Sequence, residues 1–219
     1  MFIAIVPAFN EAKHIFNVVT RLHPHVDRVI VVDDCSTDNT AFLAKEAGAF
    51  VISHGVNRGQ GASLQTGHVC ALDLGATHVL HFDGDGQFDV SDILPAYTKL
   101  KESGVDVLFG SRFLGKDSNI PFLKRYLFFP IGRLINRLFA RVRLRDVHNG
   151  FRILNRKALL HVVITQDGMA HATQIPALVQ RYKLQYIEHP VLVTYHEFGQ
   201  GLRGGVTIVR DLFMDRFIR

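Results

Sequence analysis

The chain has 219 residues, of which 47% are hydrophobic and 21% charged, a composition typical of one globular domain and unlike that of a disordered chain. Its two cysteines, Cys35 and Cys70, exclude a disulfide scaffold and favour a reducing, cytoplasmic compartment, and no apolar run reaches the roughly 18 residues of a membrane-spanning helix. The net charge of +5 is uneven, because residues 1–111 carry 7 basic and 13 acidic side chains whereas residues 112–219 carry 18 basic and 7 acidic. This asymmetry predicts a first half that holds a cation and a second half that meets an anionic partner.

Apolar runs and helix-like patterns alternate along the first half of the chain. Near-continuous Val, Ile, Leu and Phe runs between helices predict a doubly wound, mostly parallel α/β sheet that helices cover on both faces. We expect strands at 2–6, 28–34, 49–54, 77–83 and 105–111, and helices at 11–22, 36–48, 61–75 and 91–104. The second half suggests a basic amphipathic helical segment at 120–145, then the motif GFRILN at 150–155, a helix near 170–182 and a strand at 184–198.

A polar motif follows each of the five strands expected in the first half. In chain order these motifs are PAFNE, DDCSTD, HGVNRGQG, DGDGQ and GSR. Because the carboxyl ends of parallel strands meet at one edge of a sheet, and ligands of such sheets bind there, we expect the five motifs to form one site.

The motif DGDGQ carries two carboxylates one residue apart, Asp83 and Asp85. Carboxylates in a tight turn, here permitted by Gly84, can converge on a hard divalent ion such as Mg²⁺ or Mn²⁺. A solvated turn is the alternative for this motif taken alone. In DDCSTD, we expect Asp33 to accept hydrogen bonds from the N–H of a uracil or guanine ring and Asp34 to have a structural or ribose-binding role, unless one of them only caps the next helix.

Two further loops suggest contacts to a nucleotide. Pro7, the backbone carbonyl of Ala8 and Glu11 could line a nucleoside slot, although Glu11 could instead simply begin a helix. The glycine-rich run NRGQGAS enters a helix, so its backbone N–H groups could hold an anion.

The motifs IVPAFNE, VVDDCSTDNT, NRGQGAS, DGDGQFD, GSRF, NGFRILNR and YIEHPV occur in the order seen in family 2 glycosyltransferases. The chain resembles in particular the dolichyl- and polyprenyl-phosphate sugar synthases, over most of its length up to about Pro190. The resemblance implies a nucleotide-sugar-binding, Rossmann-like fold of the glycosyltransferase-A type. It also implies one domain over 1–219, in which 1–111 binds the nucleotide sugar and metal and 112–219 binds the acceptor.

The resemblance also implies roles for individual residues. The base and ribose of a UDP- or GDP-sugar would contact Pro7, Glu11 and Asp33. Asp83 and Asp85, with Gln87 nearby, would place Mg²⁺ or Mn²⁺ on the diphosphate. Phosphate groups and the acceptor would be met by basic residues and one acid of the second half: Arg112, Lys124, Arg125, Asp146, Arg152 and Arg203.

Two positions depart from the family pattern. Gln174 stands where the family often has glutamate, and the run GQGLR replaces a Gly-x-Ser-Lys motif, so that Arg203 stands for the lysine with a shift of one residue. These departures concern the acceptor side of the predicted site.

The segment 120–145 combines bulky apolar residues with lysines and arginines, and no acid interrupts it from Lys124 to Arg145. This pattern fits a helix at an anionic membrane surface, and the alternative is a core or dimer helix with a solvated basic face. A homo-oligomer or a membrane-protein partner is compatible with either. We expect no nucleic-acid partner, because no recognised binding module is present.

Together these observations predict a metal-dependent, inverting transfer of a sugar from a nucleoside diphosphate sugar to a polyprenyl phosphate at the cytoplasmic face of a membrane. A phosphate acceptor is already anionic and requires no general base, whereas a sugar hydroxyl requires one, for which Asp146 is the candidate. The alternatives are a soluble glycosyltransferase that acts on a glycan hydroxyl in polysaccharide or cell-envelope synthesis, and a non-catalytic protein that binds nucleotide sugars.

Overall fold

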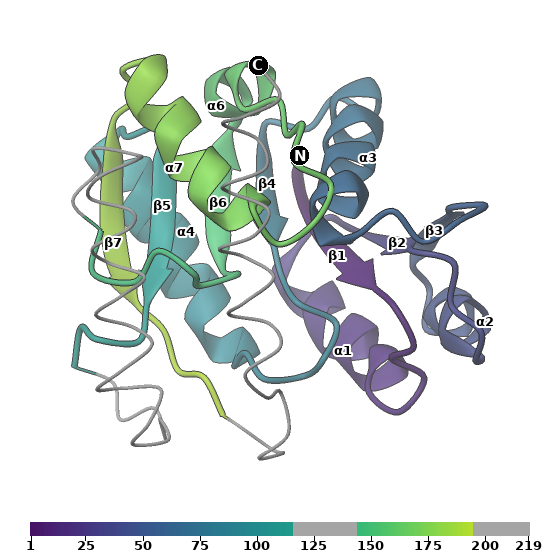
Figure 1. Ribbon diagram of the computed structural model, residues 1–219. Coiled ribbons are helices and arrows are strands. Elements are labelled where there is room, and N and C mark those ends of the chain that lie inside the picture. The colour runs from purple at the N-terminus through teal and green to yellow at the C-terminus, as the bar shows by residue number, and fades with distance from the viewer. Residues whose placement is uncertain (116–143, 195–219) are drawn as a thin grey trace.

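The computed structural model describes residues 1–115 and 144–194, which form a sheet with helices on both faces (Figure 1). The strands are β1 Phe2–Ala8, β2 Arg28–Asp33, β3 Phe50–Ser53, β4 His78–His81, β5 Val107–Ser111, β6 Arg152–Asn155 and β7 Tyr186–Pro190. The helices are α1 Ile15–Leu22, α2 Thr40–Glu46, α3 Gln60–Asp73, α4 Ile93–Ser103, α6 Arg156–His161 and α7 His171–Arg181, with short 3₁₀ turns at His23–His25 and Val90–Asp92.

The seven strands lie in the order β3-β2-β1-β4-β6-β5-β7. The chain runs outward from β1 to β3 and then returns to place β4 on the other side of β1, so the strand order switches between β1 and β4. All neighbouring pairs are parallel except those of β6, which runs antiparallel to both β4 and β5. The carboxyl ends of the other strands therefore share one edge, and β6 begins at that same edge.

Alternating side chains of the strands form two separate hydrophobic cores. Along β1, Phe2, Ala4 and Val6 pack with α1, α2 and α4, whereas Ile3 and Ile5 pack with α3, α6 and α7. The sheet is therefore apolar on both faces, as the continuous apolar runs predicted. Burial of both faces fixes the register of the strands, and with it the positions of the loops at the carboxyl edge.

The structure confirms the five strands and four helices expected in the first half, with shifted ends. The first helix begins at Ile15 and not at residue 11, because residues 11–14 form a turn in which the Glu11 carbonyl accepts the N–H groups of His14 and Ile15. Helix α6 and the antiparallel direction of β6 were not predicted. The strand expected at 184–198 is limited to Tyr186–Pro190 within the described residues.

Most of the basic segment 120–145 lies outside the described residues, as do Lys124, Arg125 and Arg203. Among residues 1–115 and 144–194, no helix combines the length and apolar character needed to cross a membrane.

Candidate active site

The polar motifs predicted to meet do lie at one edge of the sheet. Loops from the carboxyl ends of β1, β2, β4 and β5 reach this edge, and they are joined by the loop 144–151 that leads into β6. The register explains the position of the last loop, since Arg152 at the start of β6 pairs with His81 at the end of β4. The candidate site therefore lies at the switch point between β1 and β4, where open α/β sheets bind their ligands.

Asp83 and Asp85 lie in the loop that follows β4. The Gln60 side-chain amide donates a hydrogen bond to Asp83 Oδ1 at 2.8 Å, and the backbone of Gly150 packs against the same carboxylate so closely that a Cβ there would overlap it. Asp85 Oδ1 accepts the backbone N–H of Gln87 at 3.0 Å. Three separate segments of the chain therefore fix this pair of carboxylates.

The carboxylates of this site repel one another. Burial raises the pKa of Asp83 to about 7, and the charge of Asp85 adds to the effect, while Arg152 and Arg112 oppose it. Burial, then the charges of Asp85 and Asp38, likewise raises the pKa of Glu11 to about 7. A cation placed between these carboxylates would relieve the repulsion.

The donor set agrees with the chemistry of Mg²⁺ or Mn²⁺. Within the described residues, no group of three or more His, Cys, Asp or Glu side chains could enclose a metal. Mg²⁺ is commonly bound by only one or two protein carboxylates, with phosphate oxygens and water completing its shell. Asp83 and Asp85 therefore fit a cation that arrives with a diphosphate.

On the nucleoside side, the structure leaves two predicted carboxylates available. Asp33 is buried at the end of β2, and its Oδ1 accepts the backbone N–H of Ser36 at 3.3 Å, while no hydrogen bond from the described residues reaches Oδ2. The Glu11 carboxylate likewise receives none, although its backbone N–H is held by the Thr40 hydroxyl. Pro7 is partly exposed, and the Ala8 carbonyl accepts the Asp34 N–H at 2.8 Å, which leaves its second lone pair for the predicted contact to a nucleoside.

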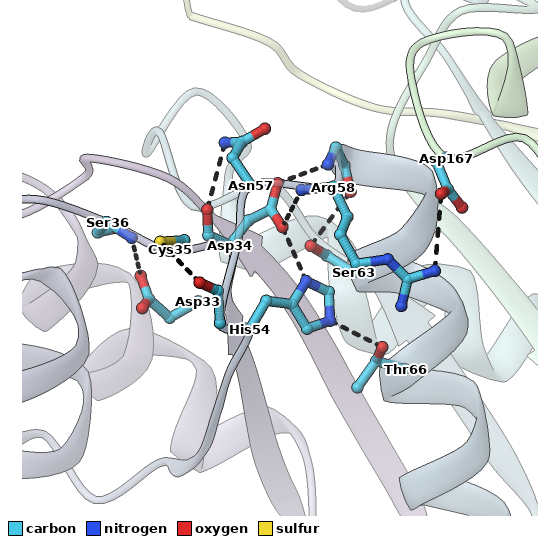
Figure 2. Close-up of polar contacts among 12 residues, drawn as sticks. Asp33, Asp34, Cys35, Ser36, His54, Asn57, Arg58, Ser63, Thr66 and Asp167 are labelled. Carbon is cyan, nitrogen blue, oxygen red and sulfur yellow. Dashed lines mark hydrogen bonds and ion pairs between the residues drawn. The ribbon is translucent and has the colours of Figure 1, made fainter.

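Asp34 binds the protein itself (Figure 2). Its carboxylate accepts the backbone N–H groups of Arg58 at 2.9 Å and Gly59 at 2.6 Å, and lies 2.7 Å from Nδ1 of His54, whose Nε2 contacts Thr66. Burial alone would raise the pKa of Asp34, but these donors hold it below its usual value. Because Asp34 is buried and both of its oxygens accept hydrogen bonds from the protein, this arrangement favours the structural role over the ribose contact.

Most N–H groups of the glycine-rich run bind other parts of the protein, contrary to the expectation from the sequence that they would hold an anion. The N–H groups of Arg58 and Gly59 bind Asp34, and those of Gly61 and Ala62 bind the Asp167 carbonyl at 2.8 and 3.2 Å. The glycines instead permit close packing, because a Cβ on Gly59 or Gly61 would overlap the backbone of residues 166–167. This loop therefore packs the first half of the chain against residues 166–167 of the second half.

Arg112 and Asp146, both predicted for the acceptor side, form a buried ion pair. Arg112 donates from Nε at 2.6 Å and from Nη2 at 2.5 Å to the two carboxylate oxygens, and its backbone N–H adds a third bond at 3.0 Å. Asn149 donates a fourth bond to Asp146. Burial would raise the pKa of Asp146, but the Arg112 guanidinium and its hydrogen bonds lower it. A base so engaged accepts a proton poorly, so the geometry assigns Asp146 to holding Arg112 and not to proton abstraction.

The side chain of Arg152 is buried, so an acceptor could not contact it. Its side chain is only 1% exposed, packed between β4 and β5 on the face covered by α3 and α7. The prediction that Arg152 contacts the acceptor therefore needs correction: its charge acts on Asp83 and Asp146 from beneath the site.

Buried histidines surround Arg152 on the same face of the sheet. His68 on α3 and His81 on β4 approach through their Nε2 atoms at 2.6 Å, and His171 on α7 donates from Nδ1 to the Gly168 carbonyl. Burial lowers the pKa of His68 and His171 to about 4 and that of His81 well below its usual value. His81 and His171 are thus core histidines that are neutral at pH 7.

A cavity of about 180 Å³ opens beside the metal-site loop. It lies between α1 and the residues that follow β4, and is lined by Lys13, His14, Asn17, Val18, Arg21, Phe82, Gly86, Phe88 and Val90. Sites that enclose drug-sized ligands have volumes of roughly 300–1,000 Å³. This cavity is therefore too small to enclose a nucleoside diphosphate sugar, and it lies to one side of Asp83 and Asp85.

Sequence reasoning missed three residues that shape the site. Gln60 contacts Asp83, Gly150 admits the Asp83 carboxylate, and His54 supports Asp34. The glycines on both sides of Gln60, and Gly150 two residues before β6, are local signals of close backbone approach. The sequence around His54 contains no comparable signal of its contact with Asp34.

A mostly parallel sheet with clustered carboxylates at its switch point defines an α/β protein of the nucleotide-binding type. The chain belongs to glycosyl transferase family 2, whose model matches residues 3–163, and it is a glycosyltransferase. This result confirms the family predicted from the motifs.

Several relatives cover nearly the whole chain. An uncharacterized protein of Methanocaldococcus jannaschii is 30% identical over 97% of this chain and 90% of its own length. A UDP-N-acetylglucosamine–dolichyl-phosphate N-acetylglucosaminyltransferase of Methanococcus voltae is 29% identical, over 95% of this chain and 92% of its own. The polyprenol monophosphomannose synthase of Mycolicibacterium smegmatis is 26% identical, over 96% of this chain and 84% of its own.

A solved structure has the same fold. Glucosyl-3-phosphoglycerate synthase of Mycobacterium tuberculosis, crystallised with Mn²⁺, UDP and glucosyl-3-phosphoglycerate, superposes with a TM-score of 0.72 at 18% identity, over 98% of this chain and 79% of that one. The likeness confirms the predicted glycosyltransferase-A fold.

Proposed function

We propose that this glycosyltransferase moves a sugar from a nucleoside diphosphate sugar to a polyprenyl phosphate. The observation that carries the proposal is the pair Asp83 and Asp85 at the switch point of a family 2 fold. Relatives named for dolichyl-phosphate and polyprenol substrates, which align over almost the whole chain, support the choice of acceptor.

The donor would lie across the ends of β1, β2 and β4. Asp33 and Glu11, whose carboxylates receive few or no hydrogen bonds from the described residues, are suited to accept them from the base and ribose, beside Pro7. Mg²⁺ or Mn²⁺ at Asp83 and Asp85, with Gln87 nearby, would offset the charge that develops on the departing diphosphate. The raised pKa values of Asp83 and Glu11 support a site that is completed by a cation.

An acceptor phosphate suits the state of Asp146. Attack by a phosphate oxygen on the anomeric carbon, in line with the departing diphosphate, inverts the configuration and needs no proton removed. A hydroxyl acceptor would need a general base, and Asp146, the acid predicted for that task, is bound by Arg112 and has a lowered pKa. The described residues therefore favour the phosphate over the glycan hydroxyl.

The acceptor would be presented by the basic second half of the chain at a membrane surface. Residues 112–219 carry 18 basic and 7 acidic side chains, and each lysine or arginine near an anionic leaflet contributes ~1 kcal/mol of attraction. Lys124 and Arg125 would contact the acceptor phosphate, with the protein bound peripherally at the cytoplasmic face.

The proposal is tested with purified protein, Mg²⁺ or Mn²⁺, a panel of UDP- and GDP-sugars, and a polyprenyl phosphate, by measuring the released nucleoside diphosphate. Asp85→Ala is expected to lower turnover at least about 100-fold, because a cation bound by only two carboxylates would lose one. Asp89→Asn is the control in the same loop, since the Asp89 carboxylate accepts the Ser91 N–H at the start of the 3₁₀ turn and pairs with Arg21.

The outcomes separate the proposal from its alternatives. No turnover with any donor would leave only a non-catalytic nucleotide-sugar-binding protein. Transfer to a glycan hydroxyl but not to polyprenyl phosphate, together with failure to float with anionic liposomes, would establish the soluble glycosyltransferase instead. Equal activity of Asp85→Ala and Asp89→Asn would refute the metal site.

A further inference from the structure

We infer that Gln60 is a positioning residue for Asp83, and that the acceptor half of the chain holds Gln60 in place. The inference rests on the proposed function, because it takes Asp83 as a carboxylate that binds the cation. It adds a structural link from the second half of the chain to Asp83, and the neutral side chain of Gln60 is the last step of that link.

The contact itself is direct. Gln60 Nε2 lies 2.8 Å from Asp83 Oδ1, and no other described side chain donates a hydrogen bond to this carboxylate. The opposite side of the carboxylate faces the backbone of Gly150, which offers it no donor side chain. In the described part of the chain, the orientation of Asp83 therefore depends on a single hydrogen bond and on packing.

A neutral donor suits this position. A lysine or arginine in place of Gln60 would bind Asp83 more strongly, but its charge would repel a divalent cation held by the same carboxylate. The Gln60 amide fixes the position of Asp83 Oδ1, and because the amide is neutral, the negative charge of Asp83 stays available to the cation. Hydrogen bonds from such outer groups orient metal ligands, and their loss typically costs 10- to 100-fold in metal affinity or activity.

The backbone on both sides of Gln60 is held by other parts of the molecule. Before it, the Gly59 N–H binds Asp34 at 2.6 Å, and φ of Gly59 is 104°, a conformation that glycine adopts readily. After it, the N–H groups of Gly61 and Ala62 both bind the Asp167 carbonyl. Gln60 is the first residue of α3, so these contacts fix where its side chain begins.

The segment 165–167 is in turn fixed from α7. Gln174 Oε1 accepts the N–H groups of Thr165 and Gln166, each at 3.0 Å, and its Nε2 donates to the Thr165 hydroxyl at 2.6 Å. Figure 2 shows Asp167 facing Arg58, an exposed pair at 3.6 Å that adds little. Gln174, one of the departures from the family pattern, thus supports the segment that holds the start of α3.

The test compares two glutamines of the same helix. Gln60→Met removes the amide donor at similar volume, and Gln60→Asn keeps the amide but is one methylene too short to reach Asp83. Gln65→Met is the control, because Gln65 Oε1 accepts the Ile164 N–H at 2.7 Å and its substitution disturbs helix packing without touching Asp83. Electron paramagnetic resonance of free Mn²⁺, titrated into the full chain with UDP present, measures cation affinity, and thermal unfolding measures folding.

Both Gln60 variants are expected to bind Mn²⁺ 10- to 100-fold more weakly while unfolding near the wild-type temperature, and Gln65→Met is expected to retain wild-type affinity. In turnover assays their defect should diminish as Mn²⁺ is raised. Wild-type Mn²⁺ affinity in both Gln60 variants, or an equal loss in Gln65→Met, would overturn the inference and leave the proposed function intact. Failure of the wild type itself to bind Mn²⁺ with UDP would overturn both.

Discussion

Acidification is expected to destabilise the protein through its buried histidines, and His68 gives the clearest case. Its side chain is 1% exposed, its Nε2 lies 2.6 Å from Nε2 of His81, and burial lowers its pKa from 6.5 to about 4. Between these two values the unfolded chain binds more protons than the folded one. The stability that neutral His68 contributes is therefore complete above about pH 6.5 and is lost as the pH falls toward 4.

The size of the effect follows from the shift. A difference of about 2.5 pKa units, at ~1.4 kcal/mol per unit, amounts to ~3 kcal/mol between pH 7 and pH 4. Asp83 and Glu11 act in the opposite sense, since their raised pKa values give stability that is present below their unfolded pKa of about 4 and is lost as the pH rises toward 7. His81, His171 and Arg152 face the same buried layer, so the wild type alone does not isolate His68.

Comparison of the wild type with His68→Gln isolates the contribution of His68 to the pH dependence of stability. Free energies of unfolding are measured by urea titration from pH 7 to 4.5 for the wild type, His68→Gln and the control His161→Gln, whose ring is exposed on α6. The variant at position 68 should lose less stability on acidification than the wild type, by up to ~3 kcal/mol at the acid end, and the control should follow the wild type. Parallel curves for all three proteins would refute the depressed pKa of His68.

Two further predictions concern the loop 144–151. Gly150→Ala should weaken Mn²⁺ binding and lower the unfolding temperature together, because the new Cβ would displace the Asp83 carboxylate; calorimetry and Mn²⁺ titration check this, and an unchanged Mn²⁺ affinity would contradict it. Asp146→Asn should lower the free energy of unfolding by ~3–5 kcal/mol, since it leaves the Arg112 guanidinium buried without its carboxylate. A loss below ~1 kcal/mol in urea titration would show that this pair does not support the fold.

The sheet and the position of the site could be predicted because both follow from local patterns. Apolar runs such as Phe2–Val6 identify buried strands, and polar residues directly after them, such as Asp83 and Asp85, must lie at the carboxyl edge. The direction of β6 could not be predicted in this way, since a strand of four residues with only two apolar side chains, Ile153 and Leu154, gives no sign of which neighbours it pairs with.

The sequence alone could not show which hydrogen-bond or ion-pair partner each polar group of the site would have. Arg112 and Asp146 are 34 residues apart, and only the tertiary fold shows that they form an ion pair. The glycine-rich run has the appearance of an anion site, yet its N–H groups bind Asp34 and the Asp167 carbonyl. A local pattern shows which groups need a partner, while the assembled fold decides which partner they find.

The reversed strand β6 has a consequence for how such a protein can diversify. Because β5 ends and β6 begins at the same edge of the sheet, the chain departs after Gly115 and returns at Leu144 on the side where the nucleotide sugar is expected to bind. The described strands on either side of this stretch, β5 and β6, pair with each other and with β4 and β7. Substitutions between Gly115 and Leu144 are therefore expected to change the acceptor while the strands that carry the donor side keep their pairing.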